Sequence, residues 1–324
     1  MRSFTHIDAR TVEEACSLLA KYGGRAVLNA GGTDLLSTLK GEHLETYPEA
    51  VINGKTIAGL DYIKEDGRGL EIGAFTTLDA IIKSAVINER CPLLSRAAAT
   101  VATPQVRNAA TVGGNLCQDV RCWYYRYPRH IGGPLICLRK GRGACLAVRG
   151  DNRYHAIMQA KKCFAVCPSD LATVLSAFDG EAICAGPKGE RGIAIGAFFN
   201  PLGNALTKGE MVTGIRVPAP VRQARQTFSK FTLRKPVDFA IVSVACVTAV
   251  EGGICTDVRL ALGAVGPGPV RAVEAEDFVK GKAIDAAVSV EAAALALRGA
   301  RHLSMNKYKV EISRTLVRRA LAGE

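Results

Sequence analysis

The chain has 324 residues, of which 48% are hydrophobic and 22% are charged. This composition is typical of a soluble globular protein and excludes a disordered or fibrous one. No run of about 18 apolar residues occurs, so the sequence predicts no membrane-spanning helix. The N-terminus has no apolar segment before a small-residue cleavage site, so we expect no signal peptide and a cytoplasmic protein.

The first 55 residues predict a small unit of strands and helices with parallel strand pairing. Thr11 and Glu14 form a capping box at the start of the first helix, and two glycines end it. Thr33 is the expected N-cap of the second helix. The predicted elements are helix 11–22, strand 25–30, a helix from residue 34 and strand 50–54.

The rest of the chain predicts alternating strands and helices, then long strands followed by helices. A domain boundary is expected near Pro218 and Pro220, because two closely spaced prolines interrupt regular structure. The predicted elements are strand, turn and helix over 69–84, a helix from 93 that continues to Pro104, helix and strand over 168–186, strand 210–218, strands 239–250 and 258–266, and helices 288–300 and 306–323.

Two turns with paired glycines follow predicted strands or β-branched residues, "LNAGGTDLL" at 28–36 and "TVGGN" at 111–115. Paired glycines let a backbone approach a ligand closely, and a following helix offers amides to an anion. Neither turn matches the G-x-G-x-x-G fingerprint, and a tight structural turn explains each one equally well. Two such turns together suit a dinucleotide pyrophosphate, which needs donors on both sides.

Six of the eleven cysteines fall within one sixth of the chain: Cys117, Cys122, Cys137, Cys145, Cys163 and Cys167. A reducing cytosol keeps thiols free, so this clustering needs another explanation than disulfides. The other five cysteines lie among apolar residues and are expected to pack as small buried side chains. Residues 118–162 also hold ten Lys or Arg against two Asp, which is two thirds of the formal net charge of +12.

Three interpretations of this cysteine segment stay open. "CFAVCP" at 163–168 has the C-x₃-C-P spacing that ends ferredoxin runs, which favours an iron–sulfur cluster. A zinc site with four thiolates is dianionic as well, so basic neighbours would suit either metal group. A basic loop with incidental thiols is the third interpretation. His130 and His155 are expected beside the site or on the surface, and Cys117 is expected to pack against the nucleotide site.

Five segments, taken in order, resemble the FAD-binding medium subunit of the xanthine-oxidase family of molybdenum hydroxylases: "NAGGTDLL", "GLEIGAFTTLDAI", "ATPQVRNAATVGGN", "GEMVTGIRVP" and "YKVEISRTLVRRAL". The resemblance covers nearly the whole chain. It implies an α+β fold with a two-subdomain FAD-binding domain of the PCMH/vanillyl-alcohol-oxidase type, followed by a C-terminal domain of antiparallel sheet plus helices. The expected boundaries are 1–55 for the first subdomain, 56–218 for the second and 219–324 for the C-terminal domain.

The same resemblance identifies the cysteine segment as an insertion at about 116–167. Ordinary members reach a "P-x-S-D"-like stretch soon after the second glycine turn, whereas about fifty residues intervene here. The insertion is similar to one that carries a [4Fe-4S] cluster in the β subunit of 4-hydroxybenzoyl-CoA reductase, and a related one occurs in some bacterial aldehyde oxidoreductases. It implies Cys122, Cys137, Cys145 and Cys163 as ligands, with Cys167 as the rival for the last position.

The resemblance also implies a set of FAD contacts. The two glycine turns would hold the pyrophosphate, Asp170 would lie near the flavin, Val212 would contact a ring, and Lys230 matches a lysine of several members. The complete expected set is Leu28, Asn29, Ala30, Gly31, Gly32, Thr33, Asp34, Leu35, Thr111, Val112, Gly113, Gly114, Asn115, Asp170, Val212 and Lys230.

These expectations describe an electron-transfer subunit with FAD and a [4Fe-4S] cluster and no catalytic residue of its own. The implied enzyme is 4-hydroxybenzoyl-CoA reductase, which dehydroxylates its substrate to benzoyl-CoA in anaerobic aromatic degradation. The implied partners are a large molybdopterin subunit, a small subunit with two [2Fe-2S] clusters, and an external donor such as ferredoxin; neither nucleic acid nor a membrane is expected. The alternatives are the flavin and iron–sulfur subunit of a molybdenum aldehyde oxidoreductase, and a zinc-stabilised basic binding protein.

Overall fold

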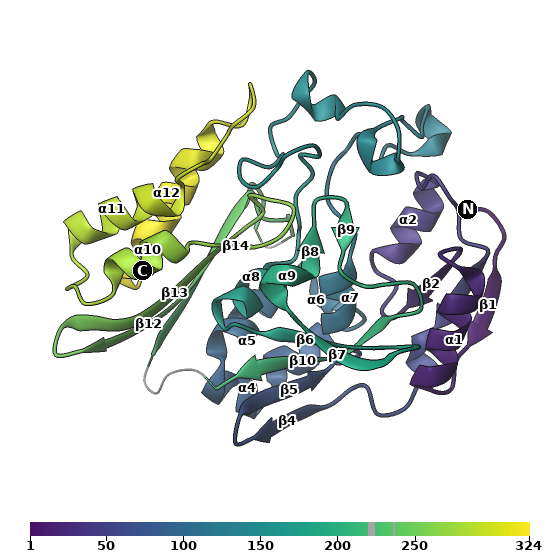
Figure 1. Ribbon diagram of the computed structural model, residues 1–324, viewed down its shortest axis with the longest axis horizontal. Helices are drawn as coiled ribbons and strands as arrows, with labels where there is room; N and C mark the ends of the chain where they lie inside the picture. The colour runs from purple at the N-terminus through teal and green to yellow at the C-terminus, as the bar shows by residue number, and fades with distance from the viewer. Residues whose placement is uncertain (220–223, 236) are drawn as a thin grey trace.

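The computed structural model describes residues 1–219, 224–235 and 237–324. Pro220, which helped to predict the domain boundary, lies outside these ranges. The described chain forms three main sheets from successive stretches of sequence, plus one two-stranded sheet. Figure 1 shows the three sheets side by side, with the N-terminal unit at one end and the C-terminal sheet and its helices at the other.

The N-terminal unit is a parallel three-stranded sheet in the order β1-β3-β2. The Thr11 hydroxyl accepts a hydrogen bond from the Glu14 amide at 3.1 Å, and Gly23 ends the first helix with a left-handed φ of 59°. The parallel pairing and the Thr11 cap are therefore confirmed, whereas the Glu14 carboxylate accepts a hydrogen bond from the Arg10 amide at 2.7 Å instead of the Thr11 amide that a capping box uses. The elements are β1 (Thr5–Asp8), α1 (Val12–Tyr22), β2 (Ala26–Asn29), α2 (Leu35–Gly41) and β3 (Ala50–Asn53).

The N-cap predicted for the second helix is wrong. Helix α2 has Asp34 rather than Thr33 at its N-cap, and the Asp34 side chain makes no capping hydrogen bond. Its carboxylate instead accepts hydrogen bonds from the Arg126 guanidinium and the Asp119 amide. The contact between Asp34 and Arg126, 92 positions apart, outweighs the local preference for Thr33 as N-cap. A local sequence pattern does not reveal such a contact.

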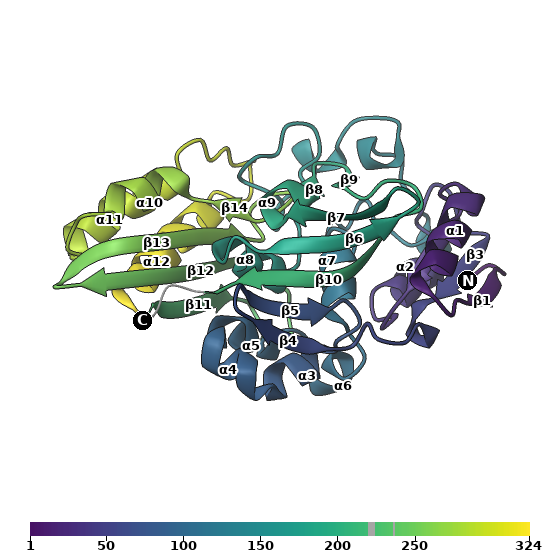
Figure 2. The same ribbon diagram turned by 60° about the horizontal axis from the view of Figure 1, so that its bottom comes forward.

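The central sheet has five antiparallel strands in the order β4-β5-β10-β6-β7. Figure 2 shows the short helices α3 to α6 below its β4–β5 edge. The strands are β4 (Ile63–Asp66), β5 (Gly69–Gly73), β6 (Glu181–Gly186), β7 (Gly189–Ala194) and β10 (Met211–Pro218), with the small pair β8 (Phe199–Asn200) and β9 (Gly203–Asn204). The helices are α3 (Leu78–Lys83), α4 (Ala85–Arg90), α5 (Pro92–Ala99), α6 (Pro104–Arg107), α7 (Val112–Cys117), α8 (Asp170–Ala177) and α9 (Ile195–Phe198).

The helix predicted to continue to Pro104 ends earlier. Helix α5 stops at Ala99, Ala102 has a left-handed φ of 46°, and Pro104 begins α6 instead of ending α5. The Arg107 guanidinium donates hydrogen bonds to the carbonyls of Val101 and Ala102, which holds the chain open between the helices.

The C-terminal domain is an antiparallel sheet in the order β11-β12-β13-β14, covered by three helices. This confirms the predicted antiparallel sheet plus helices. The elements are β11 (Arg225–Phe231), β12 (Val242–Glu251), β13 (Ile254–Gly263), β14 (Val270–Arg271), α10 (Val273–Val279), α11 (Ala286–Ala296) and α12 (Tyr308–Ala322).

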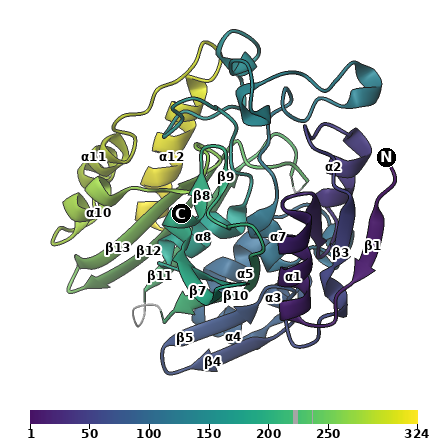
Figure 3. The ribbon, with the colours of Figure 1, turned by 45° about the vertical axis from the view of Figure 1, so that its right-hand side comes forward.

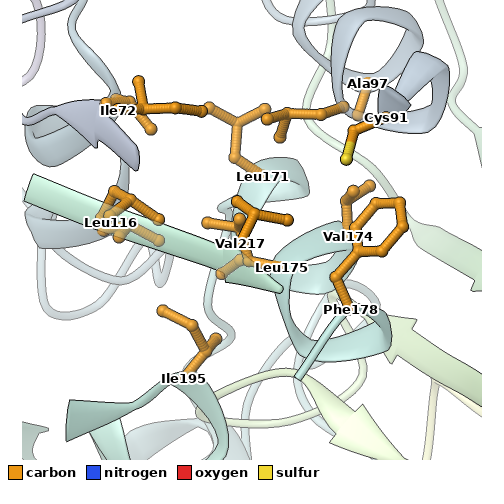
Figure 4. Close-up of a cluster of buried hydrophobic side chains, with 14 of the residues drawn as sticks. Ile72, Cys91, Ala97, Leu116, Leu171, Val174, Leu175, Phe178, Ile195 and Val217 are labelled. Carbon is orange, nitrogen blue, oxygen red and sulfur yellow. The ribbon is translucent and has the colours of Figure 1, made fainter. Parts of the chain in front are cut away.

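Helix α8 joins the two larger domains. Every residue of the helix is buried, and Figure 4 shows Leu171, Val174 and Leu175 projecting from it into the surrounding apolar side chains. The helix packs on β12 and β13 on one side and on α5 on the other. Most of its side chains are apolar and Asp170 is paired with Lys230, so the helix suits a position inside the core.

The insertion predicted at 116–167 contains no strand longer than a single bridge, between Arg121 and Val166, and its only α-helical residues are the end of α7. Its regular turns are the 3₁₀ segments Arg129–Ile131, Leu138–Lys140 and Leu146–Val148. Figures 1 and 3 place it over one edge of the molecule, between α2 and the end of the C-terminal domain. In the described ranges no helix is long and apolar enough to cross a membrane.

Candidate FAD cavity and cysteine site

The two glycine turns line one cavity of about 730 Å³. This volume lies within the range usual for cofactor sites. The predicted FAD contacts that line it are Leu28, Ala30, Gly31, Gly32, Thr33, Asp34, Leu35, Thr111, Gly113, Gly114, Asn115 and Val212. Cys117 lines the same cavity, as the sequence predicted for a residue packed beside the nucleotide site.

The glycines are needed because the chain is crowded where the turns meet. A Cβ atom on Gly31 would lie 2.0 Å from the Ala109 carbonyl oxygen, and one on Gly113 would lie 2.8 Å from Ala74. The Thr111 hydroxyl accepts a hydrogen bond from the Gly114 amide at 3.1 Å and begins helix α7. These contacts keep both turns close to the cavity, so the residues present fit a dinucleotide with its pyrophosphate between them.

Four predicted FAD contacts do not line the cavity. Val112 is completely buried in the core, and Asn29 is half-buried with an amide oxygen that has no hydrogen-bond partner in the described chain. Asp170 and Lys230 form a buried ion pair with 2.7 Å between Oδ2 and Nζ. Lys230 also donates to the Thr100 carbonyl, next to Val101 in the cavity wall, so the pair lies directly behind the wall.

The cysteine site is a much smaller cavity of about 10 Å³, on the same measure that gives about 730 Å³ for the FAD cavity. Cys122, Cys137, Cys145 and Cys163 all line it, although they are up to 41 residues apart in sequence. Cys167 does not line this cavity; it lines the FAD cavity instead. Tyr125, Leu138 and Ala165 line the same cavity beside the thiols.

The four thiols line one cavity. In the described parts of the chain, no group of three or more His, Cys, Asp or Glu side chains is arranged so that it could hold a metal ion. A polynuclear cluster has its ligands on the outside of a cubane, whereas a single zinc ion needs four sulfurs at about 2.3 Å. Four thiols in one cavity are a donor set that either an iron–sulfur cluster or a zinc ion can use.

Cationic groups stand close to this cavity. Arg139 lines it, lies over the Tyr125 ring and pairs with Asp119 at 3.2 Å. Lys140 is buried and places its ammonium over the same ring while donating to the Leu135 carbonyl. Two buried cations beside four thiols would offset the negative charge of a thiolate-bound cluster.

His155 is in contact with one of the thiols, whereas His130 is exposed. The Nε2 atom of His155 lies 3.2 Å from Cys122 Sγ. Burial, with help from the Lys309 ammonium, lowers the pKa of His155 to about 4, so its ring is neutral at physiological pH. His155 thus lies beside the cysteine site and His130 lies on the surface, as the sequence predicted.

A network of charged side chains connects the two cavities. Asp34, in the first glycine turn, pairs with Arg121 and Arg126 of the insertion, each at 2.9 Å. Asp119 accepts hydrogen bonds from the Tyr125 hydroxyl at 2.6 Å and from Arg139. The sequence showed that this segment is basic. It did not indicate which of its arginines would pair with Asp34.

Several arginines of the insertion form ion pairs with carboxylates of the same chain. Besides the arginines of that network, Arg129 lies 3.9 Å from Glu42, Arg142 pairs with Glu45, and Arg153 pairs with Asp151. The first two pairs join the insertion to the residues that follow α2, and the third lies within the insertion.

Comparison with known proteins agrees with this geometry. Residues 2–220 match the family described as the FAD binding domain in molybdopterin dehydrogenase, and residues 226–323 match the CO dehydrogenase flavoprotein C-terminal domain. The chain belongs to the FAD-binding subunits of the molybdopterin dehydrogenases. It is thus an FAD-containing subunit of an oxidoreductase, as expected.

Several relatives in this family match over most of the chain. The FAD-binding subunit PaoB of an aldehyde oxidoreductase from Escherichia coli K12 is 33% identical over 86% of each chain. The carbon monoxide dehydrogenase medium chain of Hydrogenophaga pseudoflava is 28% identical over 98% of this chain and 96% of its own. The crystal structure of that carbon monoxide dehydrogenase superposes with a TM-score of 0.80 over 99% of this chain and 97% of the other, at 27% identity.

A further solved structure supports the fold alone. Quinoline 2-oxidoreductase from Pseudomonas putida 86 superposes with a TM-score of 0.77 at 22% identity, covering 99% of this chain and 96% of the other. The predicted α+β architecture, with an FAD-binding domain followed by a C-terminal sheet and helices, is confirmed by these matches and by the three sheets.

Proposed function

We propose that this chain carries a [4Fe-4S] cluster as well as FAD and transfers electrons for a molybdenum enzyme whose substrate chemistry takes place on another subunit. The single observation that carries the proposal is the pair of neighbouring cavities, one lined by the glycine turns and the other by four cysteines. When bound, FAD exchanges electrons in pairs or singly and an iron–sulfur cluster exchanges them singly.

The residues of the chain would divide the work as follows. Gly31, Gly32, Gly113 and Gly114 would let the two turns approach the pyrophosphate, and Val212 would contact a ring of FAD. Asp170 and Lys230 would act on the flavin end through the cavity wall behind which they pair. The remaining predicted FAD contacts, Asn29 and Val112 included, would shape the two turns.

The cluster would be held by Cys122, Cys137, Cys145 and Cys163. All four line one cavity with Arg139 and Tyr125, which favours Cys163 over Cys167 as the fourth ligand. The pairing of Arg121, Arg126 and Arg139 with carboxylates of the same chain weighs against the alternative of a zinc-stabilised binding protein.

The implied partners are a large molybdopterin subunit and a small subunit with two [2Fe-2S] clusters, in a heterotrimer that dimerises, with an external donor such as ferredoxin. The domain boundaries at 55 and 218 and the cytoplasmic location belong to the same proposal. The resemblance of the insertion favours 4-hydroxybenzoyl-CoA reductase as the complete enzyme. The 33% identity with PaoB favours the second candidate, an aldehyde oxidoreductase.

Paired variants test whether the chain has two separable cofactor sites. Cys137→Ser should lose cluster iron and keep FAD, because only the cysteine cavity changes. Gly114→Trp should lose FAD first, because the indole fills the FAD cavity. Cys255→Ser, at a buried cysteine of β13, is the control and should keep both cofactors. Equal loss of both cofactors in the first two variants would contradict two separable sites.

The identity of the complete enzyme needs a separate assay. We would purify the chain with its native partners and compare anaerobic reduction of 4-hydroxybenzoyl-CoA with oxidation of an aromatic aldehyde. Activity with the thioester alone supports 4-hydroxybenzoyl-CoA reductase, and activity with the aldehyde alone supports the aldehyde oxidoreductase. Cofactor content is unaffected by this outcome, so the electron-transfer proposal is judged independently.

A further inference from the structure

The contact between His155 and Cys122 has a consequence for the redox properties of the site. The ring is 2% exposed and is fixed between aromatic neighbours, with centroids 5.5 Å from Trp123 and 5.9 Å from Tyr124. Its Nε2 atom lies 3.2 Å from Cys122 Sγ, which is within hydrogen-bond range for sulfur.

The C-terminal domain holds this histidine in place from the other side. Asn306 and Lys309 donate hydrogen bonds to the His155 carbonyl at 3.0 and 3.1 Å, and the His155 amide donates to the Asn152 carbonyl. Lys309 also donates to the Ala264 carbonyl at 2.7 Å. The backbone and the ring of His155 are therefore both held in place. A side chain that directs a hydrogen bond to a ligand must be fixed in this way.

The surroundings decide which ring nitrogen carries the proton. The Nδ1 atom is buried and has no hydrogen-bond partner in the described chain. A proton on Nδ1 would be a buried donor without an acceptor, which is costly, whereas a proton on Nε2 points at sulfur. The favoured arrangement is thus an Nε2–H that donates to a sulfur atom that accepts. A metal-bound thiolate is such an acceptor.

We propose that His155 is a positioning residue that orients the Cys122 sulfur and raises the reduction potential of the cluster bound there. A hydrogen bond to a ligand sulfur withdraws negative charge, and it stabilises the more negative reduced state more than the oxidised state. The inference rests on the proposed [4Fe-4S] site and adds the residue that tunes it.

The test is a redox titration of the anaerobically purified full chain with its native partners, followed by the EPR signal of the reduced cluster. His155→Phe keeps a flat ring and removes the N–H, so the midpoint potential should shift to a more negative value. His155→Gln can place a side-chain N–H near the position of Nε2 and should restore most of the shift. The flavin potential should stay unchanged in both variants.

Trp123→Phe is the matched control, because it alters a ring packed on His155 without changing the contact to sulfur. An unchanged potential in His155→Phe, or an equal shift in Trp123→Phe, would overturn the inference. If His155→Phe fails to retain iron, His155→Gln and the shorter His155→Asn are compared instead. Gln should keep a potential close to that of the wild type and Asn should not; equal potentials would overturn the inference.

The wild-type protein separates this inference from the proposal beneath it. Absence of iron and sulfide from the wild type would contradict the proposed cluster itself. Full iron content in wild type and variants with identical potentials would leave the cluster in place and contradict only the role of His155.

Discussion

Asp34 lies in the first glycine turn, yet its carboxylate faces the insertion. Burial alone would raise the pKa of Asp34, but the guanidinium groups of Arg121 and Arg126 outweigh that effect and hold the pKa below its ordinary value. The side chains are only 17 to 22% exposed, so water screens these pairs weakly. A residue of the FAD turn therefore also anchors the cysteine segment.

Asp34→Asn should destabilise the protein by about 2–3 kcal/mol at pH 7, since two half-buried cations lose their counter-ion. A carboxyl group with a depressed pKa contributes stability above its unfolded pKa, near 3.8, and loses it as the pH falls through the folded value. The difference between wild type and variant should therefore shrink from pH 7 to pH 3 in urea unfolding. Asp61→Asn, at an exposed position, is the control. A difference that does not depend on pH would contradict this account.

Gly31 tests how closely the first turn must approach its neighbours. Gly31→Ala should weaken FAD binding by about tenfold or more, because the new methyl group would overlap the Ala109 carbonyl and push the turn away. Gly196→Ala is the matched control, since a Cβ there meets nothing within 4 Å. FAD retention after gel filtration measures both, and equal retention would contradict a close approach at Gly31.

At the scale of single elements, the sequence predicted helix ends correctly where the capping contacts come from residues only a few positions away. The Thr11 cap and the glycines after α1 act within a few residues, so the helix they define was predictable. The N-cap at Thr33 and the helix up to Pro104 were not, because Arg126 and Arg107 bind groups at those positions. Such contacts depend on the tertiary fold, which a local pattern does not contain.

Helix α12 carries a buried cation that makes its stability depend on pH. Burial lowers the pKa of Lys309 to about 7, although three carbonyls, those of Tyr154, His155 and Ala264, accept hydrogen bonds from it. Above pH 7 the folded chain has lost a proton that the unfolded chain still binds. This group therefore adds stability as the pH rises toward the unfolded value of 10.5.

Lys309→Met should remove this dependence. The stability of the wild type relative to the variant should increase by about 2 kcal/mol between pH 6 and pH 9. Denaturant unfolding at several pH values measures the difference, and Lys307→Met, at an exposed position of the same segment, should show none of it. A relative stability that is constant or falls with pH would refute the assignment.

At the scale of the whole molecule, one buried ion pair links the FAD-binding domain to the C-terminal domain. Asp170 begins α8 and Lys230 lies in β11, and their side chains are 4% and 7% exposed. Burial raises the pKa of Asp170 even though Lys230 opposes the shift. The carboxylate thus depends on its partner to stay charged inside the protein.

Lys230→Met should cost about 3–5 kcal/mol, because it leaves a buried carboxylate without its cation. The double variant with Asp170→Asn should lose less than the sum of the two single losses. FAD content should fall in Lys230→Met as well, since the lysine holds the Thr100 carbonyl beside the cavity wall. Strictly additive losses with full FAD content would contradict a pair that joins the domains and supports the site.

The candidate site could be predicted from the sequence only in part. The two turns stood out because paired glycines occur in both, and the six cysteines stood out because they cluster within one sixth of the chain. The position of Asp170 and Lys230 behind the wall, the contact of His155 with Cys122, and the link from Asp34 to Arg121 could not be predicted. Each joins residues at least 33 positions apart in the sequence.

The central claim is that one chain holds a flavin and an iron–sulfur cluster in neighbouring cavities. The most direct test measures FAD, iron, zinc and acid-labile sulfide in one anaerobically purified sample of the chain. We predict one FAD per chain with about four iron and four sulfide, as a cubane with four thiolates requires. FAD without iron or sulfide, or with zinc in their place, would contradict the account.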